Sequence, residues 1–330
     1  MSLITVRPEG LYCEQGDFFI DPWRGVNTAL ITHAHSDHAR YGSQHYLATR
    51  ISEGILRKRL GEGMNLQPIE YGEKIKLGKT WVSFHPAGHV LGSAQIRVEC
   101  NDEVWVVSGD YKRCADPTCA PFEVVSCDTF ITEATFGLPI YQWQTGAETA
   151  QQIYDWWQSD LDRPSLLFCY AFGKAQRILG ELRQITNKPI YVHGAVHALT
   201  EIYRQVGVEM LETIPVSEQA RPYKFNGDLI LAPPSAHRSS WMKRFQHPQT
   251  AFASGWMAVR GARRRRGYER GFILSDHADW SGLVNTVLQT SAKTVYVTHG
   301  QSDVLSRYLS EELEIHALPL KTLFEGEGDI

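Results

Sequence analysis

The sequence predicts a mixed α/β protein in which one α/β domain is inserted into another. Short β-branched and aromatic runs, bounded by Gly, Pro and Asp, recur in the first part of the chain. From Glu148 onward, helical and strand patterns alternate, which favours a parallel α/β unit. After Gly267 the strand pattern returns, so we expect the first domain to resume there.

The strands expected in the first part are short apolar runs with period-two alternation or full burial. They are Asp17–Ile20, Thr28–Thr32, Trp81–Phe84, Ala94–Glu99, Glu103–Val107 and Thr129–Thr132.

The region from Glu148 is predicted to contain three helices and three buried strands. The helices are Glu148–Trp157, Ala175–Ile185 and Val196–Val206. The strands are Ser165–Tyr170, Pro189–Val192 and Asp228–Ala232. Near the end, each of two strands is followed by a helix, in the order Gly271–Leu274, Trp280–Leu288, Thr294–Thr298 and Asp303–Leu313. We therefore expect a first domain at residues 1–139 and 263–330, with an inserted domain at residues 140–262.

Composition sets limits on function without naming one. The chain has 330 residues, 43% hydrophobic and 21% charged, which is ordinary for a globular protein. Its formal net charge is −4, so any basic surface for nucleic acid must be local. No apolar stretch is long enough for a membrane span and no signal peptide is apparent, so a cytoplasmic protein with reduced thiols is expected. Cys114, Cys119 and Cys127 have irregular spacing without a nearby histidine, which favours packing over a third metal site.

The strongest signal is a run of ligand-type residues directly after the expected strand Thr28–Thr32. The run is His33-Ala34-His35-Ser36-Asp37-His38. Alternate residues of an extended segment face one side, so His33 and His35 can meet one metal ion. Ser36 is a good helix N-cap and would direct Asp37 and His38 toward a second position. Burying several imidazoles and a carboxylate without metal or partners is costly, so a metal site is the favoured interpretation.

Further ligand-type residues follow other expected strands. His89 lies in a Gly-rich turn after Trp81–Phe84, Asp110 follows Glu103–Val107, and His299 follows Thr294–Thr298. Each fits an ordinary turn when taken alone. Their shared position after an apolar strand favours a common site, in which Asp110 would bridge two ions.

The order HxHxDH, Gly-His, Gly-Asp and a late His resembles the metallo-β-lactamase fold superfamily over nearly the whole chain. The resemblance implies an αββα sandwich and two divalent ions. His33, His35 and His89 would hold one ion, Asp37, His38 and His299 the other, and Asp110 both. Asp21 would orient the ligand loop from the second shell. Nitrogen and oxygen ligands suit zinc, with manganese or iron as alternatives, and two ions would share a hydroxide as nucleophile.

A second set of motifs resembles the β-CASP nucleases, the branch that contains RNase J and Artemis. These motifs are Thr132-Glu133-Ala134-Thr135-Phe136-Gly137, Ala171-Phe172-Gly173-Lys174-Ala175-Gln176-Arg177, Ala253-Ser254-Gly255-Trp256-Met257 and Leu274-Ser275-Asp276-His277-Ala278-Asp279. The resemblance implies an inserted β-CASP domain and catalytic roles for Asp110, Asp21, Glu133 and His277. Glu133 would hydrogen-bond His277, which would contact the scissile phosphate and protonate the leaving oxygen.

Two groups of basic residues are candidate nucleic-acid contacts. Lys174 and Arg177 lie at the start of an expected helix, where backbone N–H groups attract anions. The second group is a local run of arginines between two of the motifs, comprising Arg260, Arg263, Arg264, Arg265 and Arg266. Such a run is often a solvated surface, but in an otherwise acidic protein we expect it to follow a phosphate backbone.

In detail, the motifs look like those of bacterial ligase-associated DNA exonucleases, which are Artemis-like. That resemblance implies a metal-dependent DNA exonuclease in end processing and repair, associated with an ATP-dependent DNA ligase and a helicase. One departure favours RNA, because Artemis-type DNA nucleases typically lack the last histidine and this chain has His299. The alternative is an RNase J-like ribonuclease with the same site. A small-thioester hydrolase would need neither the insert nor the arginine run, and a non-catalytic module would not need every ligand position filled.

Overall fold

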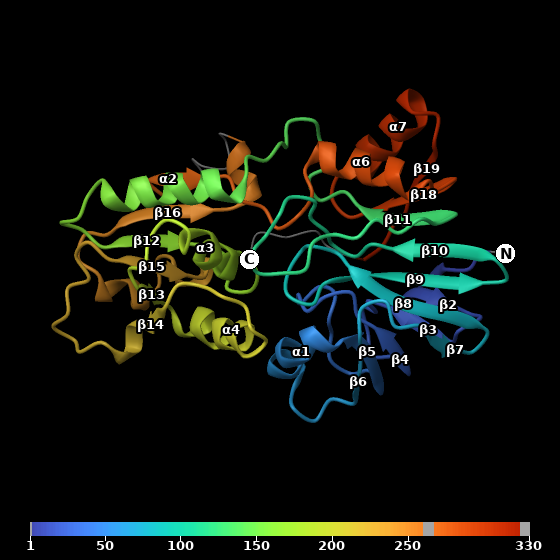
Figure 1. The fold of residues 1–330 in the computed structure, drawn as a ribbon, viewed down its shortest axis with the longest axis horizontal. Coiled ribbons are helices and arrows are strands. Elements are labelled where there is room, and N and C mark those ends of the chain that lie inside the picture. The colour runs from blue at the N-terminus through green and yellow to red at the C-terminus, as the bar shows by residue number, and fades with distance from the viewer. Residues whose placement is uncertain (1, 260–266, 324–330) are drawn as a thin grey trace. The chain divides into compact units, whose positions relative to one another are not determined.

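The computed structural model describes residues 2–259 and 267–323 (Figure 1). The chain divides into two compact units. The first unit comprises residues 2–113, 119–142 and 277–323 of the described chain. The second comprises residues 114–118 and 143–276, apart from 260–266. Within the described ranges, no helix is both long and apolar enough to cross a membrane.

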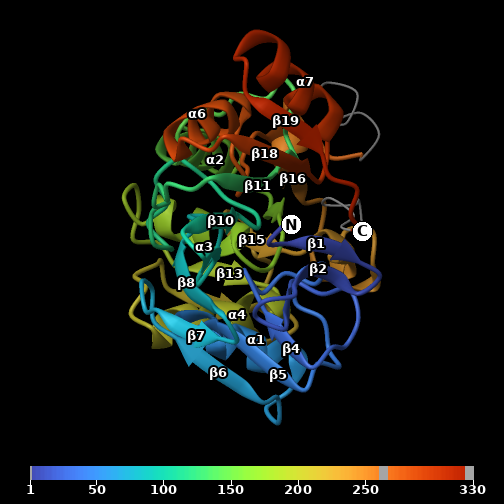
Figure 2. The ribbon, with the colours of Figure 1, turned by 90° about the vertical axis from the view of Figure 1, so that its right-hand side faces the viewer.

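The first unit contains a six-stranded sheet with strands in sequence order. These are β1 (Thr5–Arg7), β2 (Gly10–Cys13), β3 (Phe18–Ile20), β4 (Thr28–Leu30), β5 (His45–Thr49) and β6 (Leu66–Ile69). β1 to β3 are antiparallel, whereas β3 to β6 are parallel. Helix α1 (Glu53–Leu60) connects the parallel pair β5 and β6, and it lies beside them in Figures 1 and 2.

The second sheet of this unit has seven strands in the order β19-β18-β11-β10-β9-β8-β7. Their bounds are Ile75–Leu77 (β7), Thr80–Pro86 (β8), Ala94–Cys100 (β9), Glu103–Val107 (β10), Thr129–Glu133 (β11), Thr294–Thr298 (β18) and His316–Pro319 (β19). β10, β11, β18 and β19 are parallel, and Glu133 is in register with Thr298. The residues that follow these parallel strands therefore meet at one edge of the sheet.

Two hydrophobic clusters hold the first unit together. One joins inward residues of both sheets, including Phe18, Leu30, Phe84 and Ile96. The other packs helices α6 (Trp280–Thr290) and α7 (Ser302–Glu312) against the far side of the seven-stranded sheet. Consecutive residues of β10 show this division, because Val106 belongs to the helix-facing cluster and Val107 to the cluster between the sheets.

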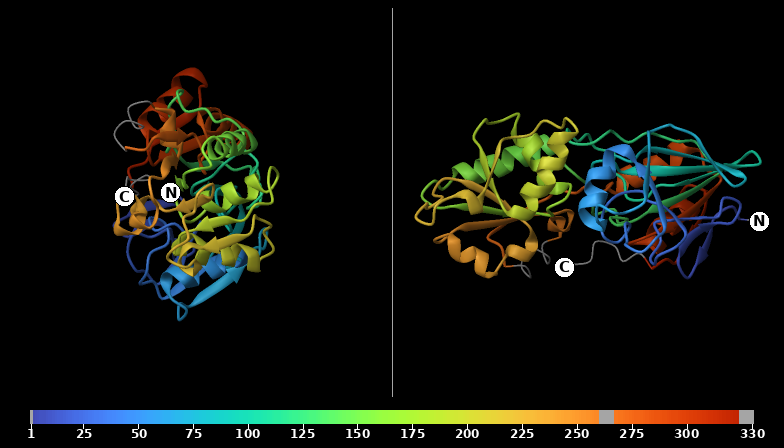
Figure 3. Two further views of the ribbon diagram at one scale, coloured as in Figure 1. Left: turned by 90° about the vertical axis from the view of Figure 1, so that its left-hand side faces the viewer. Right: turned by 90° about the horizontal axis from the view of Figure 1, so that it is seen from below.

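The second unit contains a fully parallel six-stranded sheet in the order β14-β13-β15-β12-β16-β17. Its strands are β12 (Ser165–Phe168), β13 (Ile190–Val192), β14 (Thr213–Pro215), β15 (Leu229–Ala232), β16 (Gln249–Ala253) and β17 (Arg270–Phe272). Its helices are α2 (Gly146–Gln158), α3 (Lys174–Leu182) and α4 (Gly194–Gln205), which accompany the strands in the two views of Figure 3.

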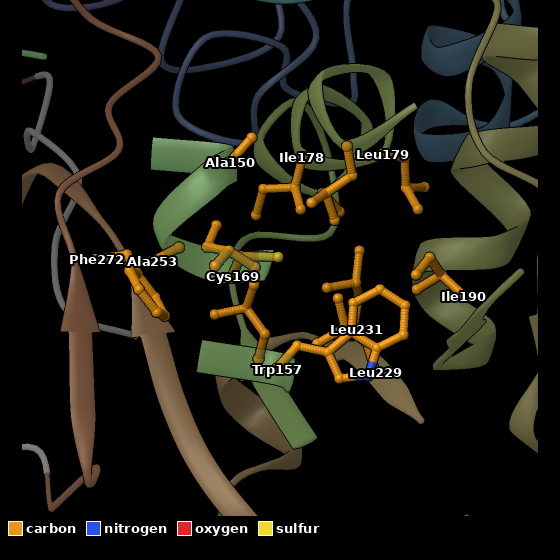
Figure 4. Packing of buried hydrophobic residues seen from close by; sticks show 14 of the residues in the cluster. Ala150, Trp157, Cys169, Ile178, Leu179, Ile190, Leu229, Leu231, Ala253 and Phe272 are labelled. Atoms are coloured by element: carbon orange, nitrogen blue, oxygen red, sulfur yellow. The ribbon is translucent and has the colours of Figure 1, made fainter. Parts of the chain in front are cut away.

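Period-two burial divides the side chains of this parallel sheet between two cores. Leu167 joins the cluster that the helices cover, whereas its neighbours Leu166 and Phe168 join a second cluster. Figure 4 shows the first cluster, in which Trp157 packs near Leu229. Apolar strands buried in this way are typical of parallel sheets.

The structure contains the strands and helices expected over the ranges given above, with ends shifted by a few residues, but not the helix expected after the N-cap candidate Ser36. One assignment is wrong in its location. The strand expected at Gly271–Leu274 forms as β17, but it pairs with β16 in the second unit and not with a sheet of the first. Alternation along a strand does not reveal the strand's partner, because pairing depends on segments distant in sequence. Several elements were not expected, among them β5, α1 and β6.

Candidate metal centre

Four ligand-type side chains follow the end of strand β4. They are His33, His35, Asp37 and His38. The backbone N–H groups of His38 and Ala39 both donate to the carbonyl oxygen of His35, at 3.2 and 2.8 Å. This single turn is not continued as a helix. The helix predicted to begin at Ser36 is therefore wrong, although the turn still changes the direction of the chain between His35 and His38.

Further candidate ligands follow three strands of the seven-stranded sheet. His89 comes after β8, Asp110 after β10 and His299 after β18. Within the described chain, the seven predicted ligands form three overlapping groups whose ligand atoms lie within 4.8 Å of one another. The groups are His33, His35, His89 and Asp110, then His33, Asp37 and His38, and last His38, Asp110 and His299.

The carboxylate of Asp110 lies at the centre of these groups. Its Oδ2 is 3.5 Å from Nε2 of His33 and of His38, and 3.8 Å from Nε2 of His89. Its Oδ1 is 3.2 Å from Nδ1 of His299. The first three separations exceed a normal hydrogen bond. Each fits a pair of ligands that share an ion, since ligand atoms about 2.1 Å from a tetrahedral zinc lie roughly 3.4 Å apart. The donor set, nitrogen and carboxylate oxygen, also suits a divalent metal.

Asp21 contacts two residues of the ligand segment, Thr32 and His38. Its Oδ2 is 2.7 Å from Nδ1 of His38. Its Oδ1 accepts a hydrogen bond of 2.7 Å from the backbone N–H of Thr32, whose hydroxyl donates to Oδ2. An ionised carboxylate only accepts, so Nδ1 of His38 carries the proton and Nε2 is the nitrogen directed at Asp110. Thr32 thus belongs to the site, although the sequence did not single it out. Its place between strand and ligand run was the available signal.

Burial and neighbouring charge give the imidazoles opposite tendencies. Burial, together with the nearby His38, holds the pKa of His33 well below its usual value. For His38, burial lowers the pKa, but Asp110, Asp37 and Asp21 outweigh it and raise the pKa to about 10. Burial raises the pKa of Asp110, but the imidazoles, His38 first, hold it well below the usual range. Asp110 is therefore ionised, as a metal ligand must be.

Gly109 allows the chain to bring Asp110 close to the ligand loop. Its φ is +55°, in the left-handed region that favours glycine. A Cβ at this position would lie 2.6 Å from Cβ of Thr32. Only a residue without a side chain lets these two segments approach in this way.

A carboxylate and a histidine form a second pair beside the ligands. Nδ1 of His277 lies 2.8 and 3.0 Å from the two oxygens of Glu133, and both side chains are buried. Glu133 also accepts a 2.8 Å hydrogen bond from the backbone N–H of Tyr111, next to Asp110. Ligand atoms of Asp110, Glu133 and His277 lie within 4.8 Å of one another. The pair is therefore in contact with the candidate metal groups.

The residues predicted to contact nucleic acid have different outcomes. Lys174 and Arg177 are 1% and 2% exposed, and they form ion pairs with Asp276 and Asp116 respectively. Both charges are paired with buried carboxylates, which favours a structural role, and their contact with nucleic acid stays a prediction. The partner carboxylates lie far away in sequence, so a local motif does not reveal these ion pairs. The other predicted contacts lie outside the described residues: Arg260, Arg263, Arg264, Arg265 and Arg266.

The cysteines take no part in the candidate metal groups of the described chain. All six are free thiols. Cys127 is buried, and burial raises its pKa to about 12. These observations support a packing role for Cys127, as its spacing in the sequence favoured.

A carboxylate shared between histidine groups at strand ends, with a buried Glu–His pair beside it, defines the site as a candidate metal-dependent hydrolase centre. No family model matches the chain. The chain is 28% identical over 310 residues to "Probable DNA ligase" of Opitutus terrae. This alignment covers 92% of this chain and 30% of that protein. The chain is 26% identical to "RNase J-like protein" of Methanocaldococcus jannaschii, over 42% of this chain and 36% of that one. It is 27% identical to "Ribonuclease TTHA0252" of Thermus thermophilus, over 53% of this chain and 48% of that protein.

These relatives confirm the resemblance to the β-CASP nucleases of the metallo-β-lactamase fold. The chain spans between 30% and 48% of their length. Among solved structures, a crystal structure of a protein of unknown function from Enterococcus faecalis has a TM-score of 0.59. It covers 90% of this chain and 80% of its own, at 12% identity, and it supports the fold alone.

Proposed function

We propose that this chain is a metal-dependent nuclease that hydrolyses phosphodiesters in nucleic acid, with DNA ends as its substrate in repair. The buried Glu133–His277 pair beside Asp110 is the observation that carries the proposal. A histidine that a buried carboxylate orients beside the metal groups is placed to give a proton to a leaving oxygen. The names of the relatives, two of them ribonucleases, support the nuclease class.

We propose the αββα sandwich of the metallo-β-lactamase fold for the first unit and a β-CASP domain for the second unit. The inserted domain then extends past the expected residue 262, because β17 belongs to its sheet. The cluster between the two sheets, and the helices packed on the seven-stranded sheet, support the sandwich. The parallel sheet of the second unit supports a separate inserted domain.

Two divalent ions, zinc in the first place and manganese as an alternative, are the proposed cofactors. His33, His35 and His89 would hold one, Asp37, His38 and His299 the other, and Asp110 both. Bound divalent ions supply Lewis acidity, which activates water and offsets the negative charge of a phosphodiester. The chain's own contribution is orientation, because Asp21 fixes the tautomer of His38 through Nδ1.

His277 is the proposed acid for the leaving oxygen. Nδ1 faces the carboxylate of Glu133, so Nε2 is the nitrogen that would give its proton to that oxygen. Glu133 favours the protonated imidazole and holds its ring in place. The peptide N–H of Tyr111 in turn fixes Glu133, which ties the acid to the strand end that carries Asp110.

For substrate binding, we propose that the arginine run at residues 263–266, with Arg260, follows the phosphate backbone. Lys174 and Arg177 are paired with Asp276 and Asp116, so the arginine run is the proposed contact in the first place. An association with an ATP-dependent DNA ligase and a helicase stays a prediction. The relative named as a probable DNA ligase, whose aligned part is 30% of its length, supports the ligase half of that prediction.

The second candidate function is an RNase J-like ribonuclease. It is favoured by His299, which lies 3.2 Å from Asp110, and by the relatives named as ribonucleases. The two functions separate when end-labelled single-stranded DNA and RNA of matched sequence are incubated with the protein and several divalent metals. Shortening of DNA from an end, with RNA left intact, is the expected result. Cleavage of RNA alone would favour the second function, and cleavage of neither would contradict the nuclease proposal.

A further inference from the structure

The segment that leads into His277 lacks the support of regular structure. β17 ends at Phe272 and α6 begins at Trp280, so the residues between them make no ladder or helix hydrogen bonds. Beyond His277, the N–H of Ala278 donates to the carbonyl oxygen of Tyr111 at 2.6 Å. On the preceding side, side chains of helix α3 contact the chain at Ser275 and Asp276.

Two buried cations of helix α3 contact consecutive residues of that segment. Nζ of Lys174 lies 3.3 Å from Oδ2 of Asp276, with both side chains at most 2% exposed. Nη1 of Arg177 donates a 2.6 Å hydrogen bond to the carbonyl oxygen of Ser275. Lys174 and Arg177 are three residues apart and therefore share a face of the helix. Asp276 directly precedes His277 in the chain.

Arg177 also contacts a second chain segment, which follows a candidate metal ligand. Its Nε lies 3.6 Å from Oδ2 of Asp116, six residues after Asp110. Asp116 accepts hydrogen bonds from the N–H and the hydroxyl of Thr118, which hold its carboxylate in place. Helix α3 thus contacts the segments at residues 114–118 and 275–276, which both belong to the second unit.

Buried ion pairs of this kind contribute little net stability, because desolvation offsets their attraction. Such pairs can instead fix a local geometry, and here the geometry concerns the residue next to the proposed acid. We propose that Lys174 and Arg177 are positioning residues, which hold the backbone at Ser275 and Asp276, the two residues that lead into His277. This inference rests on the proposed function, since that function gives His277 its task.

The test compares Lys174→Met and Arg177→Lys with the unmodified protein on single-stranded DNA. Misplacing a reacting group slightly costs up to about 10²-fold in rate, so kcat should fall by roughly 10–100-fold while KM stays within about twofold. In a His277→Ala background, the same substitutions should lower kcat no further, because they act through that side chain. Arg177→Lys keeps the buried charge and serves as the second variant if Lys174→Met does not fold.

Thr200→Val is the matched control. Its hydroxyl is buried and accepts a 3.1 Å hydrogen bond from Gln176, which lies on α3 between the two cations. The substitution disturbs the same helix without touching Ser275 or Asp276, so kcat should be unchanged. A loss of kcat in this control equal to that in Lys174→Met would overturn the inference.

A spectroscopic readout makes the test independent of activity. Nδ1–H of His277 donates to a carboxylate, so its proton resonance in ¹⁵N-histidine-labelled protein should lie downfield. Lys174→Met and Arg177→Lys should shift or broaden that resonance, and Thr200→Val should not. An unchanged resonance together with an unchanged kcat overturns the positioning role. A raised KM at normal kcat overturns it as well, since it indicates contact with nucleic acid. If the unmodified protein cleaves neither DNA nor RNA, the proposed function fails, and the resonance still decides whether the cations position His277.

Discussion

Nδ1 of His277 lies 2.8 Å from Oε2 of Glu133, although 143 residues separate the two in the chain. The pair is buried, and Glu133 is fixed in turn by the N–H of Tyr111. A histidine held in this way presents its other ring nitrogen in one defined direction. That nitrogen, Nε2, is the proposed proton donor to the leaving oxygen.

Substituting His277 by alanine should lower kcat by roughly 10²–10⁴, the usual effect of removing a positioned acid or base. Metal content should remain normal, because His277 is assigned no metal. Glu133→Gln should do less damage, since an amide can still accept from Nδ1 but does not favour the protonated ring. Turnover of single-stranded DNA and metal analysis of each variant check this. Loss of one ion from His277→Ala would make His277 a ligand and remove it as the acid.

Removing Asp21 should weaken metal binding without changing a ligand. Asp21→Ala leaves Nδ1 of His38 and the N–H of Thr32 without their carboxylate, so the ring of His38 loses its fixed orientation. Residues that support a ligand in this way typically change affinity by about 10–100-fold. Competition with a chelator of known affinity measures the effect. Asp17→Ala, which removes only a 2.9 Å hydrogen bond from Tyr12, is the control and should bind metal normally. Equal affinities in the two variants would contradict the orienting role.

Substituting Gly109 by alanine should destabilise the protein and the site together. The left-handed φ of +55° and the 2.6 Å approach to Cβ of Thr32 should cost about 1–3 kcal/mol of unfolding free energy. Denaturant titration measures the loss. Gly72→Ala is the matched control, because Gly72 also has a positive φ, of 76°, but no heavy atom near its added Cβ. Its smaller loss reports the backbone strain alone. Equal losses would mean that contact with Thr32 plays no part.

Metal binding to the metal-free protein should release protons at pH 7. The pKa of His38 is raised to about 10, so this ring is protonated at neutral pH, whereas His33, with a lowered pKa, is neutral. A ring must be neutral at its coordinating nitrogen, so His38 should release about one proton as it binds. The charged ring contributes stability that is fully present below its unfolded pKa, near 6.5, and is lost as the pH rises through about 10. Calorimetric titration in buffers of different ionisation enthalpy counts the protons. Binding with no proton release would contradict a protonated His38.

The parts of this molecule that the sequence predicted are those with a local cause. Trp280–Leu288 alternates with helical period, and Asp279 accepts a hydrogen bond from the N–H of Gly282 as its N-cap. The ligand run after β4 is equally local, because the residue types and their closeness are visible in six positions. The three helices of the second unit and strands β12, β13 and β15 were predicted for the same reason, whereas β14 and β16 were not.

The parts that the sequence did not predict depend on distant partners. Ser36 has the type of an N-cap, yet the turn there closes on His35 and ends. Lys174 has the type of a phosphate contact, yet its partner is Asp276, a hundred positions later. β17 likewise joins the sheet of the second unit because it pairs with β16, which precedes the arginine run in the sequence. Local pattern gives the element or the residue type, whereas burial and pairing come from the fold.

If hydrolysis requires metal held by the groups around Asp110, cleavage of DNA should follow the amount of metal bound. Protein stripped of metal is titrated with Zn²⁺ or Mn²⁺, while bound metal and cleavage of end-labelled single-stranded DNA are measured on the same samples. Asp110→Asn, which keeps the size of the side chain, is titrated in parallel. We expect no cleavage without metal, full activity as two ions bind to each chain, and neither stable binding nor cleavage in Asp110→Asn. Undiminished cleavage by the stripped protein, or by Asp110→Asn, would contradict this requirement for metal.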